Sequence, residues 1–231
     1  MVKNAIKFTP LMDSLPSSVP FVGPETQERL RSSKFLARLG ANENVFGPSP
    51  DAIKAMQQES KNIWMYGDPE NHDLKEALAD HHKINKNEII IGEGIDGLLG
   101  YLARMLIKPG DTVVTSNGAY PTFNFHVSGY GGVLHKVPYK SDMEDPDALI
   151  NKAVEVGAKL IYFANPDNPM GTCHSRTVIT KLINSVPDGC LLILDEAYIE
   201  FADKDVAPKL DPSSSKVVRM RTFSKGYGLA G

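Results

Sequence analysis

Three short apolar runs of the sequence are each followed by polar side chains that can do chemistry. Asn168 follows the run at residues 160–164, Asp195 and Tyr198 follow the run at 191–194, and Lys225 follows the run at 217–220. An amine is a nucleophile once it has lost its proton, and a carboxylate pairs with a cation. Ligands of open α/β sheets bind at the carboxyl ends of the strands, so these residues are candidates for one site.

Asp195 and Lys225 also have ordinary explanations. An Asp after a strand is commonly a helix N-cap, and a lone Lys in a loop is usually solvated. The turn from Gly92 to Gly97, which precedes a predicted helix, can offer bare N–H groups to a phosphate, but glycine-rich turns of this kind are common. It is neither a P-loop nor a full dinucleotide motif. A nucleotide-binding α/β domain therefore stays an alternative with weak support.

The elements that must position these residues alternate along the chain from residue 88 onward. Strands are predicted at 88–92, 112–116, 133–137, 160–164, 191–194 and 217–220, most of them apolar on both faces, as in a buried parallel sheet. Helices are predicted at 98–107 and 146–156, the second with Asp145 as N-cap, Pro146 in its first turn and Gly157 at its end. This order predicts an α/β fold, with a mostly parallel sheet in an α/β/α arrangement of three layers.

The first 40 residues differ in composition from the rest. They contain Pro10, Pro16, Pro20 and Pro24 among scattered serines and show no regular hydrophobic period. We expect an N-terminal arm with a short helix from about Glu25, followed by a large domain over residues 41–231.

Composition excludes several classes of function. The 231 residues include 25 Lys+Arg and 28 Asp+Glu, for a net charge of −3, so no basic field favours nucleic acid. No window approaches the roughly 18 apolar residues of a spanning helix, and no apolar leader segment follows Met1. Two cysteines and no leader predict a cytoplasmic protein without nucleic-acid or membrane partners. The six histidines show no ligand spacing, so no metal site is predicted.

Taken in order, the motifs resemble those of fold-type I pyridoxal-phosphate-dependent aminotransferases. The motifs are Asn-Pro-x-Asn-Pro-x-Gly at 165–171, Asp-Glu-Ala-Tyr at 195–198 and Thr-Phe-Ser-Lys-Gly-Tyr-Gly-Leu-Ala-Gly at 222–231. Within that superfamily the chain is most similar to histidinol-phosphate aminotransferases, through Asn-Glu-Asn-Val-Phe-Gly-Pro at 42–48 and Tyr-Gly-Asp-Pro at 66–69. The resemblance runs from about residue 36 to the end.

The resemblance implies pyridoxal 5′-phosphate as cofactor and assigns catalytic roles to three residues. Lys225 matches the lysine that binds the cofactor covalently and moves the proton. Asp195 matches the carboxylate that keeps the ring nitrogen protonated. Tyr198 and Asn168 match the pair that hydrogen-bonds the phenolate oxygen of the ring, and Asn168 with Asn44 is expected to face the substrate.

The remaining cofactor contacts implied by the resemblance surround the ring and its phosphate. An aromatic side chain stacks on the ring, while helix N–H groups and hydroxyls hold the phosphate together with a phenol from the other subunit of a homodimer. In this sequence the matching residues are Phe123 for the ring, Gly94, Ile95, Asp96, Thr222 and Ser224 for the phosphate, and Tyr66 from the other subunit.

The sequence departs from the family pattern in three places. Met170 and Ile95 stand where Thr and Ser are usual. The chain also stops at Gly231, and the phosphate-binding and carboxylate-binding arginines of the family are expected beyond it. We therefore expect the front part of a longer protein that lacks the small C-terminal domain.

Four functional hypotheses follow from this resemblance. The first is transamination between a histidinol-phosphate-like amine and a 2-oxo acid such as 2-oxoglutarate. The second and third are an aromatic amino-acid aminotransferase and a threonine-phosphate decarboxylase-like enzyme, which share these motifs. The fourth is a binding or regulatory module that keeps the fold without turnover.

Overall fold

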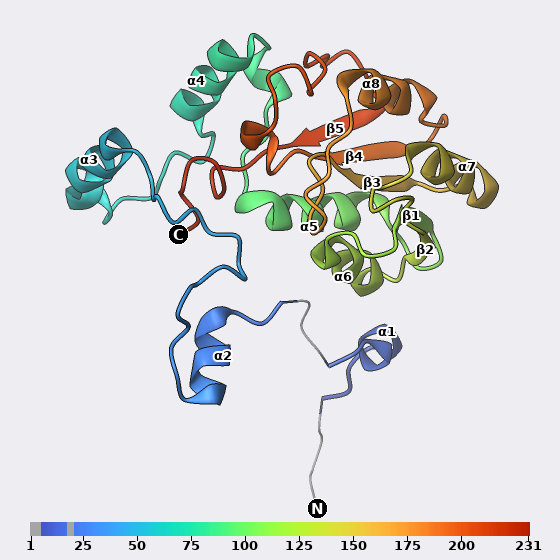
Figure 1. The fold of residues 1–231 in the computed structure, drawn as a ribbon, viewed down its shortest axis with the longest axis horizontal. Helices are drawn as coiled ribbons and strands as arrows, with labels where there is room; N and C mark the ends of the chain where they lie inside the picture. The colour runs from blue at the N-terminus through green and yellow to red at the C-terminus, as the bar shows by residue number, and fades with distance from the viewer. Residues whose placement is uncertain (1–5, 18–20) are drawn as a thin grey trace, which may run out of the picture.

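The computed structural model describes residues 6–17 and 21–231, and its centre is a five-stranded parallel sheet (Figure 1). The spatial order is β2-β1-β3-β4-β5, and each neighbouring pair is parallel. The strands are β1 (Thr112–Ser116), β2 (Val133–Val137), β3 (Leu160–Ala164), β4 (Leu191–Asp195) and β5 (Val217–Met220). All carboxyl ends therefore lie at one edge of the sheet, and the predicted α/β fold is confirmed.

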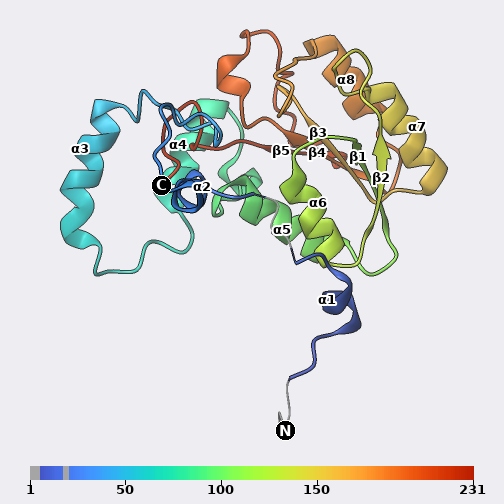
Figure 2. The same cartoon turned by 60° about the horizontal axis from the view of Figure 1, so that its bottom comes forward.

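Helices cover both faces of this sheet (Figures 1 and 2). The helices α5 (Gly94–Leu106) and α6 (Pro121–Gly129) lie on one face, and α7 (Pro146–Val156) and α8 (Arg176–Ser185) lie on the other. Successive side chains of a strand point to opposite faces. Tyr162 of β3 accordingly packs with Phe123 under α5 and α6, whereas its neighbour Phe163 packs under α7 and α8.

Helix α7 shows how the sequence defines its own ends. The side chain of Asp145 accepts a hydrogen bond from the N–H of Ala148 at 3.0 Å, and Pro146 occupies the first turn. Gly157 ends the helix in a left-handed conformation with φ of 61°. Both ends agree with the prediction. Helix α5, by contrast, begins at Gly94, four residues before the predicted start, because the glycine-rich turn itself is helical.

The predicted strand at residues 88–92 is wrong. A capping box between Asn85 and Glu88 closes a short 3₁₀ turn (Lys86–Glu88), and the chain then runs extended into α5 without a sheet partner. Ile90 is 76% exposed. A run of β-branched isoleucines favours an extended backbone, but a strand also needs a neighbour to pair with, and here the sheet ends at β5.

Four α-helices among the described residues of the N-terminal region lie outside the sheet layers. They are α1 (Pro10–Ser14), α2 (Pro24–Arg31), α3 (Pro50–Glu59) and α4 (His72–His82). Helix α2 is the expected short helix near Glu25, and Pro20 lies outside the described residues. Helix α3 and the segment after it stand away from the sheet, and Trp64 and Tyr66 there are 79% and 104% exposed (Figures 1 and 2). Within the described residues, no helix is both long and apolar enough to cross a membrane.

Candidate active site

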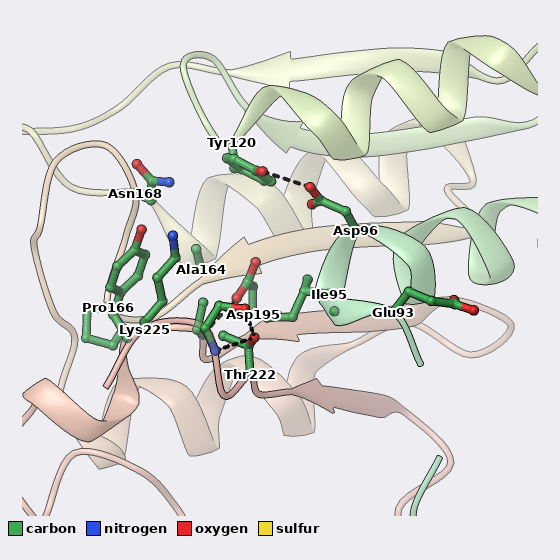
Figure 3. Close-up of a pocket in the computed structure, with 14 residues that line it drawn as sticks. Glu93, Ile95, Asp96, Tyr120, Ala164, Pro166, Asn168, Asp195, Thr222 and Lys225 are labelled. Atoms are coloured by element: carbon green, nitrogen blue, oxygen red, sulfur yellow. Dashed lines mark hydrogen bonds between the residues drawn. The ribbon is translucent and has the colours of Figure 1, made fainter. Parts of the chain in front are cut away.

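A cavity of about 230 Å³ opens at the carboxyl edge of the sheet, between the start of α5 and the loops after β3, β4 and β5 (Figure 3). Nine predicted site residues line it: Gly94, Ile95, Asp96, Asn168, Asp195, Tyr198, Thr222, Ser224 and Lys225. The other lining residues are Glu93, Tyr120, Ala164, Pro166 and Ala197. The parallel sheet thus brings together groups that are more than 130 positions apart in the sequence.

Asp195 is the last residue of β4 and is only 6% exposed. Its carboxylate accepts hydrogen bonds from the Tyr162 hydroxyl at 2.6 Å and from the Ala197 N–H at 2.9 Å. Burial raises its pKa, and these two donors oppose that shift. Neither donor is a cation. A carboxylate buried at a cavity wall in this way is suited to pair with a positive charge carried by a ligand.

Lys225 approaches the cavity from the loop after β5, and its ammonium lies 5.8 Å from the ring centre of Tyr198. The ammonium donates to the backbone carbonyls of Ala41 at 3.3 Å and Asn42 at 3.4 Å. The Asn42 amide in turn donates to the Tyr198 hydroxyl at 3.0 Å. Tyr198 also lines the cavity, and burial raises the pKa of its hydroxyl, which can still donate one hydrogen bond.

The part of the cavity wall around the start of α5 is suited to an anion. The first N–H groups of α5 have no side-chain cap among the described residues. The hydroxyls of Thr222 and Ser224 lie 2.9 Å apart in the loop after β5. Uncapped helix N–H groups and hydroxyls together favour a phosphate group. The Asp96 carboxylate at this end accepts from the Tyr120 hydroxyl at 3.1 Å (Figure 3).

The expected stacking role of Phe123 needs correction. Phe123 is fully buried and stacks on Tyr162 with ring centres 4.8 Å apart, so it supports the floor of the site and does not line the cavity. The aromatic ring at the cavity is Tyr120, which directly precedes α6. Both belong to one Tyr-Pro-Thr-Phe motif, and the helix start between them turns Tyr120 toward the cavity and Phe123 toward the sheet.

Two other predicted residues lie outside the cavity wall. The side chain of Asn44 donates to the carbonyl of Gly226 at 3.1 Å. It therefore holds the loop that carries Lys225 from outside the cavity. Tyr66 is fully exposed on the segment after α3 and does not reach this cavity. A role for Tyr66 at the site of a second subunit stays a prediction.

Sequence reasoning missed the groups that hold the site residues in place. Tyr162 sits in an apolar strand, where nothing marks it as the hydrogen-bond partner of Asp195. Glu196 is 1% exposed and forms ion pairs with Arg219 at 2.5 Å and Arg221 at 3.0 Å. The signal for this cluster was a Glu beside a predicted site Asp and two arginines at the end of the next strand.

Comparison with known proteins agrees with this geometry. The class I and II aminotransferase family matches residues 36–231. A histidinol-phosphate aminotransferase of Moorella thermoacetica is 35% identical over 94% of this chain, and one of Jannaschia is 37% identical over 84%. The crystal structure of histidinol-phosphate aminotransferase from Sinorhizobium meliloti, in complex with pyridoxal-5′-phosphate, is 48% identical and superimposes with a TM-score of 0.94 over the whole of this chain.

This chain covers only part of the length of each of these proteins. It spans 57% and 54% of the two sequence relatives and 62% of the Sinorhizobium meliloti chain. The family match, the parallel sheet and the lysine, aspartate and tyrosine gathered at its carboxyl edge agree with one another, and this chain belongs to the class I and II aminotransferases.

Proposed function

We propose that this chain forms the cofactor-binding part of a pyridoxal-phosphate-dependent aminotransferase. The observation that carries this proposal is Asp195, a buried carboxylate at the cavity wall without a cationic partner among the described residues. A protonated pyridine nitrogen supplies the missing positive charge. When bound, pyridoxal phosphate supplies an electron sink for the carbanion at the substrate α-carbon.

The other cavity residues fit the remaining parts of this cofactor. Lys225 supplies an amine for the aldehyde, and its free amine can later move a proton at the substrate α-carbon. Tyr198 and Asn168 face the cavity beside it and can hydrogen-bond a phenolate oxygen. The uncapped start of α5 with Thr222 and Ser224 can hold the phosphate.

We propose that the amino donor is histidinol phosphate or a close analogue and that the acceptor is a 2-oxo acid such as 2-oxoglutarate. The named relatives and the Sinorhizobium meliloti enzyme support this choice, as they are histidinol-phosphate aminotransferases. The alternatives are an aromatic amino-acid donor, a threonine-phosphate decarboxylase reaction, and a module that binds cofactor without turnover. We further propose a cytoplasmic homodimer with sites completed across the interface.

The test is an absorption titration of the whole protein. Pyridoxal phosphate should give a visible band, and histidinol phosphate should remove it, with recovery on addition of 2-oxoglutarate. Phenylalanine and glutamate serve as competing donors. A band that only phenylalanine removes favours the aromatic enzyme, release of carbon dioxide from threonine phosphate favours the decarboxylase, and a band that no donor changes favours the binding module. Absence of any band would refute the cofactor proposal.

A further inference from the structure

Two buried carboxyl side chains lie behind the loop that carries Asn168. Glu144 precedes α7 and is 2% exposed, and Asp167 lies in the loop after β3 and is also buried. Their carboxyl groups lie next to each other. Two adjacent buried carboxylates repel, and one can donate to the other only when it is protonated. One proton shared by the pair would remove this repulsion.

Glu144 connects this loop to the carboxyl ends of two strands. Its carboxyl group accepts from the Ser116 hydroxyl at the end of β1 and from the N–H of Ala164, the last residue of β3, the latter at 2.9 Å. The backbone carbonyl of Glu144 contacts Nε2 of His174 at 2.9 Å. Glu144 thus fixes the point where the loop that carries Asn168 leaves β3.

Asp167 fixes the loop from its other side. It accepts from the Tyr139 hydroxyl at 3.1 Å and from the Met170 N–H at 3.3 Å. Its neighbours Pro166 and Asn168 line the cavity. A movement of Asp167 therefore also displaces its two neighbours, which form part of the cavity wall.

The surroundings of the pair favour the protonated form. Burial raises the pKa of Glu144 to about 8, and burial also raises the pKa of Asp167. The other titratable groups that face the pair are Tyr139, Tyr162 and His174. None of the ion pairs found over residues 6–17 and 21–231 includes Glu144 or Asp167. No lysine or arginine thus compensates a second negative charge.

We propose that Glu144 is a positioning residue whose proton, shared with Asp167, holds Asn168 at the cavity, and that loss of this proton at alkaline pH weakens cofactor binding. The cofactor part of this inference rests on the proposed function. The reason for the weakening is repulsion, because two adjacent carboxylates push the Asn168 loop away from the ends of β1 and β3.

The experiment compares cofactor dissociation constants of the whole protein across about pH 6 to pH 9. From pH 6 to pH 9, the cofactor affinity of wild type should fall by up to about tenfold more than that of Glu144→Gln. The reason is that pH 9 is one unit above the pKa of Glu144, which is about 8. Glutamine donates to Asp167 at every pH and should remove that part of the profile. Glu155→Gln, an exposed residue of α7, is the matched control and should follow wild type.

Two further measurements keep the outcomes separate. Asp167→Asn also removes the repulsion and should flatten the profile, and it carries the test if Glu144→Gln fails to fold. The pH profile of thermal unfolding needs no cofactor, and wild type should lose stability relative to Glu144→Gln as pH rises from about 5 to about 9. Parallel profiles of wild type and Glu144→Gln in both measurements would overturn the inference. Failure of wild type to bind cofactor at any pH would instead overturn the proposed function.

Discussion

At the scale of single residues, the site is built from groups that are costly to bury without a ligand. Asp195 lies at the end of a buried strand and is held by a phenol and one N–H. Desolvation of a carboxylate costs several kcal/mol unless charge or hydrogen bonds offset it. The arrangement is understandable if the free energy is recovered when a cationic ligand binds.

Asp195→Asn separates the cofactor role from a structural role. The amide oxygen can still accept from Ala197, so the unfolding midpoint should stay close to that of wild type. An amide cannot hold the ring nitrogen protonated, so kcat should fall by a factor of about 10³ or more. Steady-state kinetics with histidinol phosphate, together with thermal unfolding, measures both. Turnover within about tenfold of wild type would show that Asp195 acts only as a cap.

Lys225→Ala should abolish turnover while cofactor still binds without a covalent bond. The lysine is the only amine that reaches the cavity wall among the described residues. Borohydride reduction of the wild-type holoenzyme followed by peptide mapping should label Lys225. Lys204→Ala, at an exposed position, is the control and should keep both label and activity. A label on any other lysine contradicts the assignment.

At the scale of elements, several contacts join the N-terminal region to the loop that carries Lys225. Residues 41–48 pass over this loop, where Asn44 binds the Gly226 carbonyl and Gly228 packs against the backbone of Gly47. A Cβ at Gly228 would lie 2.5 Å from the Gly47 carbonyl oxygen, and the φ of Gly228 is +69°. Only glycine fits both the backbone conformation and the space.

Gly228→Ala should therefore disturb the site from outside the cavity. Gly157→Ala is the matched control, because its φ is +61° and its Cβ would meet nothing within 4 Å. The control should lose about 1–2 kcal/mol of unfolding free energy from left-handed strain alone. Gly228→Ala should lose about 1–3 kcal/mol more from overpacking. Urea unfolding checks the difference, and weaker cofactor binding should accompany it only in Gly228→Ala. Equal losses of unfolding free energy in the two variants would show that residues 41–48 move aside without cost.

The sequence was sufficient for those elements whose own residues determine them. Asp145, Pro146 and Gly157 define α7 by local hydrogen bonding and backbone conformation, and five apolar runs became neighbouring strands. The run at 88–92 failed because strand formation depends on a partner that local pattern does not encode. Phe123 was misplaced because helix phase decides between two aromatics three positions apart. Tyr162 and Glu144 were missed because their hydrogen bonds come from distant segments.

At the scale of the whole molecule, the exposed segment after α3 bears on assembly. Tyr66 cannot contribute to the cavity of its own chain in this arrangement. A homodimer in which Tyr66 reaches the cofactor phosphate at the site of the second subunit would explain why this tyrosine lies on an exposed segment. We therefore expect the whole protein to sediment as a dimer.

A mixed dimer tests whether the sites are shared. One subunit carries Tyr66→Phe and the other carries Lys225→Ala. If Tyr66 acts across the interface, one site of the pair combines both defects and the other has normal Tyr66 and Lys225, so about half of wild-type activity per dimer returns. Without sharing, every site has one defect and no normal site forms. Each homodimer of a single variant is the control, and a fully active monomer would also contradict the shared site.

The exposure of Trp64 has a practical consequence for following this assembly. It is the single tryptophan among the 231 residues, and it lies two positions from Tyr66 on the same protruding segment. Its indole ring is 79% exposed, so its emission reports the solvent around this segment. A subunit that covers the segment would shift that emission to shorter wavelength. The difference in emission between wild type and Trp64→Phe at increasing dilution can therefore follow dissociation without any label.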